Sequence, residues 1–194
     1  RLTSLEVHDI VCMIGEIVIA GGVRRSALIS LSDLDDREMS RAKTGPWWEH
    51  NGHRALSNNS AVYSSKPSLG RFMEEWSALY DSRSGERGIC NREAMEKLAN
   101  MAGRESCDWG TNPCSEIILR PNQFCNLTEV VIKPYDDLPI LRHKVRKAAI
   151  LGTIQSACTR FTYLGPDWKA NCEEERLLGV SFTGIYDNKL MSNP

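Results

Sequence analysis

The sequence predicts an α/β fold, built as a sheet or a barrel with helices on both faces. Three observations support this prediction. Strand-like segments alternate along the chain with segments of helical periodicity. The last strand-like segment, 178–185, consists almost entirely of apolar or small residues, which is typical of a strand covered on both faces. The 194 residues are 41% hydrophobic, which suffices for a packed core.

The individual elements follow from periodicity and from helix caps. Apolar residues at helical spacing predict a helix over 4–20, which Gly21 and Gly22 end. Ser68 and Asn91 are suitable N-cap residues for two further helices. The segment 44–60 is rich in Gly, Pro, Asn and His, so we expect a long irregular loop of the kind that often carries function. The other elements expected are strands over 24–32, 61–63, 115–119, 127–132 and 178–185, and helices over 33–43, 68–80, 91–102, 139–163 and 166–177.

Charge and cysteine content limit the function classes. A net charge of −1 gives no reason to expect binding to nucleic acid or to an anionic membrane surface. The longest apolar run, 17–23, is too short to span a bilayer. Seven irregularly spaced cysteines without a signal peptide favour the reducing cytoplasm over a disulfide scaffold. The chain starts without Met and stops just after a strand-like segment, so we expect a fragment of a longer protein, with 1–194 forming part of one domain.

The segment GTNPCSEIILRPNQFCNLTEVV (110–131) holds two cysteines eleven positions apart. A zinc site is disfavoured because Cys107, Cys114 and Cys125 form no C-x-x-C pair, and we expect no metal site. A second interpretation is that the cysteines are buried and act as small apolar side chains. That interpretation also covers three cysteines on predicted helix or strand faces: Cys12, Cys90 and Cys158. Cys172 lies on a charged helix and is interpreted as incidental.

The residues around Cys114 favour a third interpretation, a catalytic thiol. Pro113 cannot donate to a sheet, so Asn112 and Pro113 cannot lie in a central strand and Cys114 falls at a turn. If a strand begins there, Glu116 points to the same side as Cys114. Asn112 adds an amide that can both donate and accept. A thiol, a carboxylate and an amide within five residues are typical of a catalytic site.

Several other polar residues have both a plain and a functional interpretation. Arg24 and Arg25 are either a solvated strand start or contacts for nucleotide phosphates. The histidines of the 44–60 loop are expected to be hydrogen-bonded rather than metal-bound. Asn58 and Asn59, in the run SNNS, either provide turn chemistry before a strand or line a substrate site.

NPCSE followed by CNL, with the cysteines eleven positions apart, resembles the adenosylcobalamin-dependent (class II) ribonucleotide reductases, particularly the monomeric ribonucleoside-triphosphate reductases. Four flanking segments extend the resemblance over nearly the whole chain: GGVRRSALISLSDLDD (21–36), WWEHNGHRALSNNSAVY (47–63), GERGICNREA (85–94) and RLLGVSFTGI (176–185). The resemblance implies a ten-stranded α/β barrel with a central finger loop, of which 1–194 is a part. It also implies reduction of a ribonucleotide, with a triphosphate favoured, by a thiyl-radical mechanism.

The resemblance assigns a role to each residue of the cysteine segment. Cys114, on the finger loop, would carry the thiyl radical that removes the 3′-hydrogen of the ribose. Glu116 would act as general base on the 3′-hydroxyl, and Asn112 would orient the sugar. Cys125 would be half of a redox-active pair that ends as a disulfide. Four residues are expected to contact the substrate: Pro113, Ser115, Asn58 and Asn59.

The resemblance further implies adenosylcobalamin as cofactor, a ribonucleoside triphosphate as substrate, a dNTP effector and a thioredoxin-type reductant. No cysteine here matches the redox partner of Cys125, so we expect that partner before Arg1. Most cobalamin contacts should also lie outside the chain, and the isolated chain is predicted to be inactive. Two alternatives stay open: the large subunit of a class I-type reductase with a diiron partner, and a non-catalytic α/β nucleotide-binding module. Pro113 and the short Cys114–Cys125 spacing favour the cobalamin type.

Overall fold

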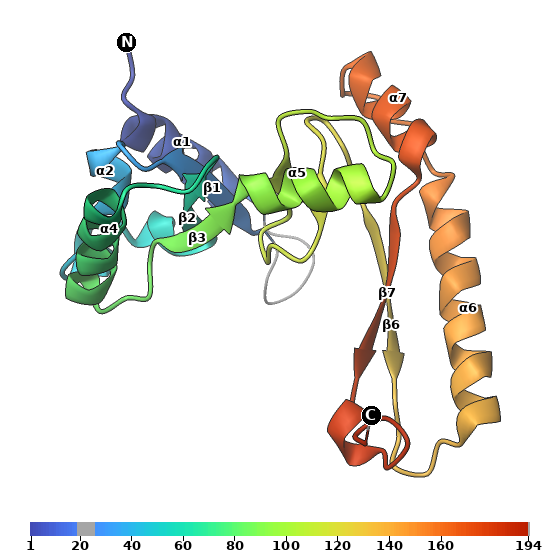
Figure 1. The fold of residues 1–194 in the computed structure, drawn as a ribbon. Coiled ribbons are helices and arrows are strands. Elements are labelled where there is room, and N and C mark those ends of the chain that lie inside the picture. Colours follow the sequence, from blue (N-terminus) through green and yellow to red (C-terminus); the bar gives the residue numbers. More distant parts are fainter. Residues whose placement is uncertain (19–25, 194) are drawn as a thin grey trace. The chain divides into compact units, whose positions relative to one another are not determined.

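The computed structural model describes residues 1–18 and 26–193 (Figure 1). The chain divides into two compact units, unit 1 (Arg1–Ile118) and unit 2 (Leu119–Pro194). Arg24 and Arg25, for which the sequence left two interpretations, lie outside the described residues.

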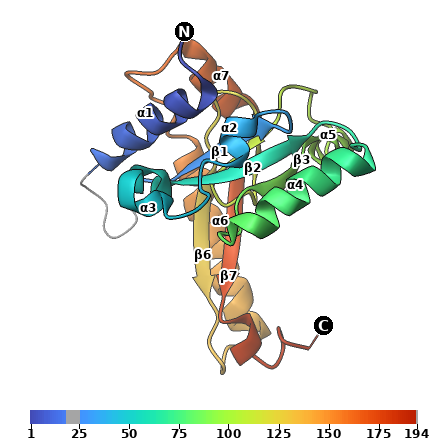
Figure 2. The same cartoon turned by 90° about the vertical axis from the view of Figure 1, so that its left-hand side faces the viewer.

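Unit 1 is built around a three-stranded parallel sheet, which Figure 2 shows with α4 alongside it. The strands are β1 (Leu28–Asp33), β2 (Ser57–Tyr63) and β3 (Gly88–Asn91), in the order β1-β2-β3. Parallel neighbours need long crossover connections, and these carry four of the six helices described in the unit, while one helix precedes β1 and one follows β3. The helices are α1 (Ser4–Glu16), α2 (Arg37–Ser40), α3 (Trp47–His50), η1 (Gly52–Leu56), α4 (Leu69–Ser82) and α5 (Arg92–Met101). Two strands of two residues each, β4 (Gly110–Thr111) and β5 (Ile118–Leu119), precede and follow the Cys114 segment in sequence.

Two helix starts in unit 1 agree with the caps expected from the sequence, whereas the helix expected over 33–43 begins only at Arg37, with Asp36 as its N-cap. The side chain of Ser68 accepts a hydrogen bond from the N–H of Arg71 at 3.4 Å, and that of Asn91 accepts from Ala94 at 2.9 Å. Each cap satisfies an N–H group that has no partner within its own helix. The predicted starts of α4 and α5 are therefore confirmed.

Unit 2 is a parallel strand pair with a long crossover between its strands. β6 (Asn126–Val131) pairs with β7 (Leu178–Thr183), and α6 (Leu138–Ser156) and α7 (Pro166–Glu175) lie between them in sequence. The short helix η2 (Ile185–Asp187) follows β7. α6 runs along the strand pair (Figure 1) and packs on it through a small core: Val130, Ile132, Leu141 and Ala148.

Only one face of the β6–β7 pair is covered within unit 2. Val130 is 4% exposed, whereas Leu127 and Val131, on the opposite face of β6, are 49% and 48% exposed. Apolar side chains on both faces are typical of a strand that is covered on both. The predicted α/β class is confirmed by the parallel sheets, but burial of 178–185 on both faces is not seen in unit 2.

Several predicted boundaries were wrong. Residues 57–60 are not part of a loop but begin β2, and β3 was missed because it is only four residues long and follows the polar segment 81–87. The strand expected over 115–119 is reduced to β5. α6 ends at Ser156 instead of 163, before a stretch rich in β-branched and aromatic residues that leads to Gly165-Pro166.

The burial of the cysteines agrees with the sequence interpretation only in part. Cys12 and Cys90 are buried, as expected of small apolar side chains. Cys158 is exposed, because α6 has ended before it, so its predicted burial was wrong. Cys172 is buried and accepts a hydrogen bond from the N–H of Phe124 at 3.2 Å, so it is not incidental. In the described part of the chain, no helix is long and apolar enough to cross a membrane.

Candidate functional site

Cys114 lies on a tight turn between β4 and β5. The N–H of Ser115 donates to the carbonyl of Asn112 at 2.9 Å, and the N–H of Ile117 donates to the side-chain oxygen of Asn112 at 3.1 Å. Ser115 has a φ of 67°, in the left-handed region that turns use. Asn112 therefore closes the turn with both its backbone and its side chain. The prediction that Cys114 lies at a turn outside any strand is confirmed.

The chemistry-bearing side chains of this turn face solvent. Cys114, Ser115 and Glu116 are exposed, and Pro113 is half-buried. The strand begins only at Ile118, so the argument that strand alternation places Glu116 beside Cys114 was wrong. The thiol, the carboxylate and the amide are instead carried by one short turn. An exposed thiol at a turn is accessible to a ligand or to another part of a larger protein.

The two asparagines of β2 have different surroundings. Asn58 is exposed and donates from Nδ2 to the carbonyl of Pro113 at 2.7 Å. Asn59 is 3% exposed, and its side-chain oxygen lies 3.1 Å from Oγ of Ser57 and 3.2 Å from Nε2 of His8. Because β2 is a strand, neighbouring side chains point to opposite faces. The structure thus places Asn58 at the Cys114 turn and Asn59 in the interior of unit 1.

Sequence reasoning missed a polar cluster that joins α1 to η1. Asp9 accepts two hydrogen bonds from Arg54, at 2.7 and 2.5 Å, and lies 3.1 Å from Nδ1 of His8. Burial raises the pKa of the Asp9 carboxyl, but the hydrogen bonds from Arg54 and His8 and the charge of Arg54 outweigh burial, and the pKa falls from 3.8 to about 2. Nε2 of His53 lies 3.3 Å from Asp9, whereas His50 is exposed. No sequence motif marks this cluster, since Asp9 and Arg54 are 45 positions apart in the sequence.

Cys125 belongs to unit 2 and lies immediately before β6. It lines a cavity of about 270 Å³ together with Cys158 and Cys172. The neighbouring backbone is tied to the segment before β7, because the N–H of Asn126 donates to the carbonyl of Leu177 at 3.3 Å. The convergence of three cysteines on one cavity was not expected from their positions in the sequence.

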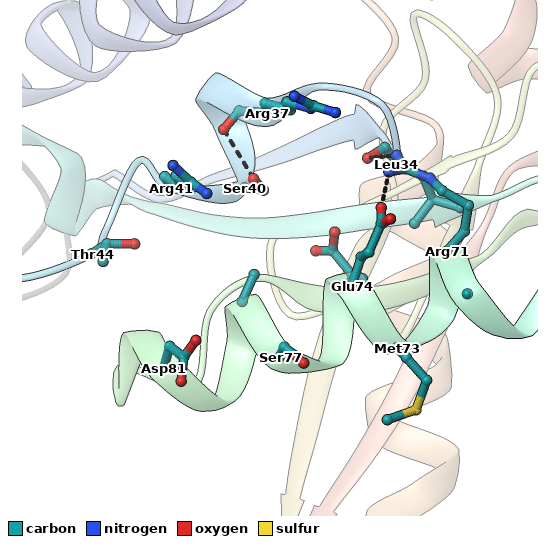
Figure 3. Close-up of a pocket in the computed structure, with 13 residues that line it drawn as sticks. Leu34, Arg37, Ser40, Arg41, Thr44, Arg71, Met73, Glu74, Ser77 and Asp81 are labelled. Carbon is teal, nitrogen blue, oxygen red and sulfur yellow. Dashed lines mark hydrogen bonds and ion pairs between the residues drawn. The ribbon is translucent and has the colours of Figure 1, made fainter.

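A cavity of about 820 Å³ lies between α2 and α4 in unit 1 (Figure 3). Arginines of both helices and acidic residues of α4 line it. Arg71 donates to Glu74 and to Asp35, both at 2.5 Å, so part of this charge is already paired. None of the lining residues belongs to the 110–118 segment. Among the described residues, no group of three or more His, Cys, Asp or Glu is arranged to hold a metal ion.

Comparison with known proteins identifies relatives of this chain among curated bacterial enzymes. No family model matches it. Curated proteins of three bacteria, each named adenosylcobalamin-dependent ribonucleoside-triphosphate reductase, align with 96% of the chain: those of Lacticaseibacillus paracasei (32% identical), Lactobacillus acidophilus (31%) and Lactobacillus leichmannii (30%). The chain is a relative of these reductases. It spans about a quarter of their length, since the alignments cover 25% of each.

Proposed function

We propose that the chain supplies the radical-carrying turn of an adenosylcobalamin-dependent ribonucleoside-triphosphate reductase. One observation carries this proposal: the NPC turn exposes the thiol of Cys114 in a chain whose relatives carry that name. The reaction replaces the 2′-hydroxyl of a ribonucleoside triphosphate by hydrogen. A role in deoxyribonucleotide synthesis implies a cytoplasmic location.

The proposed chemistry uses the residues of the turn and of the start of β6. A thiyl radical at Cys114 removes the 3′-hydrogen, while Glu116 accepts the proton of the 3′-hydroxyl. The 2′-hydroxyl leaves as water. Cys125 and a second thiol supply two electrons and two protons, one proton for the departing water and one for C2′, and become a disulfide. Glu116 returns its proton to the 3′-oxygen, and Cys114 returns its hydrogen to C3′, which restores the thiyl radical. Asn112 holds the sugar by hydrogen bonds, and its side-chain nitrogen has no hydrogen-bond partner among the described residues.

Adenosylcobalamin enters this proposal through the names of the relatives. The described residues are not assigned a complete cofactor site, because the cavity of about 820 Å³ between α2 and α4 is lined by charged side chains and includes no residue of the Cys114 turn. We therefore derive no step through the cofactor. The contribution of the chain is an accessible thiol on a turn.

The architecture of the whole protein is also part of the proposal. We infer that 1–194 forms part of a ten-stranded α/β barrel whose finger loop carries Cys114. The parallel pairing of β1, β2 and β3 and of β6 and β7 supports it. The uncovered apolar face of β6 supports it too, because a strand of a barrel is covered on both faces. A dNTP effector and a thioredoxin-type reductant complete the proposal through the resemblance alone.

The test uses the full-length protein, a ribonucleoside triphosphate, a dithiol reductant and adenosylcobalamin, with no second subunit. We expect deoxyribonucleotide to form only when the cofactor is added. Product that requires a diiron partner would support the class I-type alternative. Nucleotide binding without product under either condition would support a non-catalytic module. The isolated chain is expected to form no product.

A further inference from the structure

We propose that Asn58 is a positioning residue that fixes the Cys114 turn to the central strand of unit 1. Its Nδ2 donates to the carbonyl of Pro113 at 2.7 Å. That carbonyl belongs to the peptide bond that joins Pro113 to Cys114, so the hydrogen bond holds the backbone that carries the thiol. The anchoring of the turn does not depend on the proposed function, whereas the expected effect of Asn58 on turnover rests on that function.

The turn has few hydrogen bonds that could fix its position without Asn58. The N–H groups of Ser115 and Ile117 donate to Asn112, and Oγ1 of Thr111 donates to Oγ of Ser115 at 3.5 Å, so these bonds close the turn on itself. They set its shape but do not connect it to the sheet. In the part of the chain that the structure describes, the bond from Asn58 makes that connection, across 55 positions of sequence.

The backbone on either side of Asn58 is itself held by charged groups. Lys43, which is buried, donates to the carbonyl of Ser57 and forms an ion pair with Glu86 at 2.9 Å. Glu86 in turn accepts a hydrogen bond from the N–H of Asn59 at 2.6 Å. Hydrogen bonds to charged groups are stronger than those between neutral groups. Asn58 therefore projects from a strand that is fixed at both neighbouring residues, as an anchor requires.

Asn58 and Asn59 point to opposite faces of β2 and have different contacts. Ser57 and Asn59 are 1% and 3% exposed and point into unit 1, whereas Asn58 is exposed and points to the other side. The polar run SNNS (57–60), whose composition is typical of a turn, thus joins a buried hydrogen-bond network to the turn that carries Cys114. Because one N–H of its Nδ2 is bonded to the carbonyl of Pro113, Asn58 acts on Cys114 through the backbone.

The test compares two variants of the full-length protein. Asn58→Leu keeps a similar volume and removes the donor. Asn100→Leu is the control, since Asn100 lies exposed on α5 and its Nδ2 donates to Glu96 at 3.3 Å, in the same unit. Amide hydrogen exchange at Ser115 and Ile117 reports opening of the turn. Steady-state kinetics give kcat and KM, and thermal unfolding shows that both variants fold.

The expected result has two parts. Exchange at Ser115 and Ile117 rises by about 2- to 12-fold in Asn58→Leu, the factor that corresponds to one ordinary hydrogen bond, and is unchanged in the control. In the same variant kcat falls by about 10- to 100-fold, because the thiol is misplaced, while KM changes by less than about twofold.

Two results would overturn the inference. Unchanged exchange in Asn58→Leu would show that the bond does not hold the turn. A raised KM with unchanged kcat would show that Asn58 contacts the substrate instead. If the unsubstituted protein formed no deoxyribonucleotide, the proposed function would fail, and the exchange measurement would still decide whether Asn58 anchors the turn.

Discussion

Arg87 is the residue whose removal should destabilise unit 1 most. It is 2% exposed and lies just before β3. All five of its N–H donors have acceptors. Two bonds go to the carboxylate of Glu75 on α4, at 2.6 and 2.9 Å. The other three, at 2.7, 2.9 and 3.2 Å, go to residues at the end of β1: Ser32, Asp33 and Leu34. Arg87 therefore ties α4, β1 and β3 together.

The size of the effect follows from what remains after substitution. Arg87→Met would leave Glu75, which is 9% exposed, as a buried carboxylate without its cation. Breaking a buried ion pair in this way costs about 3–5 kcal/mol of unfolding free energy. By comparison, Lys97 and Glu93 form a pair on α5 whose side chains are 70% and 44% exposed. Lys97→Met should cost no more than about 0.5 kcal/mol.

Urea unfolding followed by tryptophan fluorescence measures this difference, because four of the five tryptophans lie in unit 1. Adding Glu75→Leu to Arg87→Met should recover part of the loss, since it removes the unpaired charge. A loss in Arg87→Met that equals the loss in Lys97→Met would refute the reasoning. A double variant less stable than Arg87→Met would do so as well.

Three further predictions concern other parts of the chain. The pKa of the Asp9 carboxyl is lowered in the folded state, so Asp9 contributes fully to stability above its unfolded pKa of about 4, and this contribution is lost as the pH falls to about 2. In Asp9→Asn, the loss of stability between about pH 4 and pH 2 that Asp9 causes should be absent from an acid-unfolding curve. Trp109→Phe should lower the unfolding free energy by about 1–3 kcal/mol, measured in urea, because Trp109 is fully buried and its indole N–H donates to Glu96 at 2.6 Å. Gly184→Ala should destabilise unit 2 by about 2 kcal/mol or more, because Gly184 has a φ of +78° and a Cβ would lie 2.4 Å from the carbonyl oxygen of Ile132. Thermal unfolding should show this as a lower melting temperature, and an unchanged melting temperature would contradict it.

Local signals in the sequence predicted the helix starts and the Cys114 turn well. Ser68 and Asn91 cap helices by contacts with residues three positions away, which a sequence displays directly. Pro113 likewise fixes its own φ and lacks an N–H wherever it occurs, so the exclusion of a central strand followed from one residue.

Long-range contacts decided what the sequence could not reveal. The run 57–60 has the composition of a turn, yet it forms the start of β2 because distant partners satisfy its polar groups. Those partners, among them His8, Lys43 and Glu86, lie between 14 and 51 positions away. In the same way, Cys172 was placed on a charged helix correctly, but its contact with Phe124, 48 positions earlier, determines its burial.

The central claim is that Cys114 carries the radical, and replacing it by serine tests this most directly. We would assay Cys114→Ser in the full-length protein with adenosylcobalamin, a dithiol and a ribonucleoside triphosphate. Cys158→Ser, which removes the exposed cysteine of unit 2, is the matched control. The account predicts no detectable deoxyribonucleotide from Cys114→Ser, with nucleotide binding retained, and full activity from the control, because a serine O–H cannot replace the thiol as hydrogen donor and radical carrier. Turnover by Cys114→Ser within about tenfold of the unsubstituted protein would contradict the account.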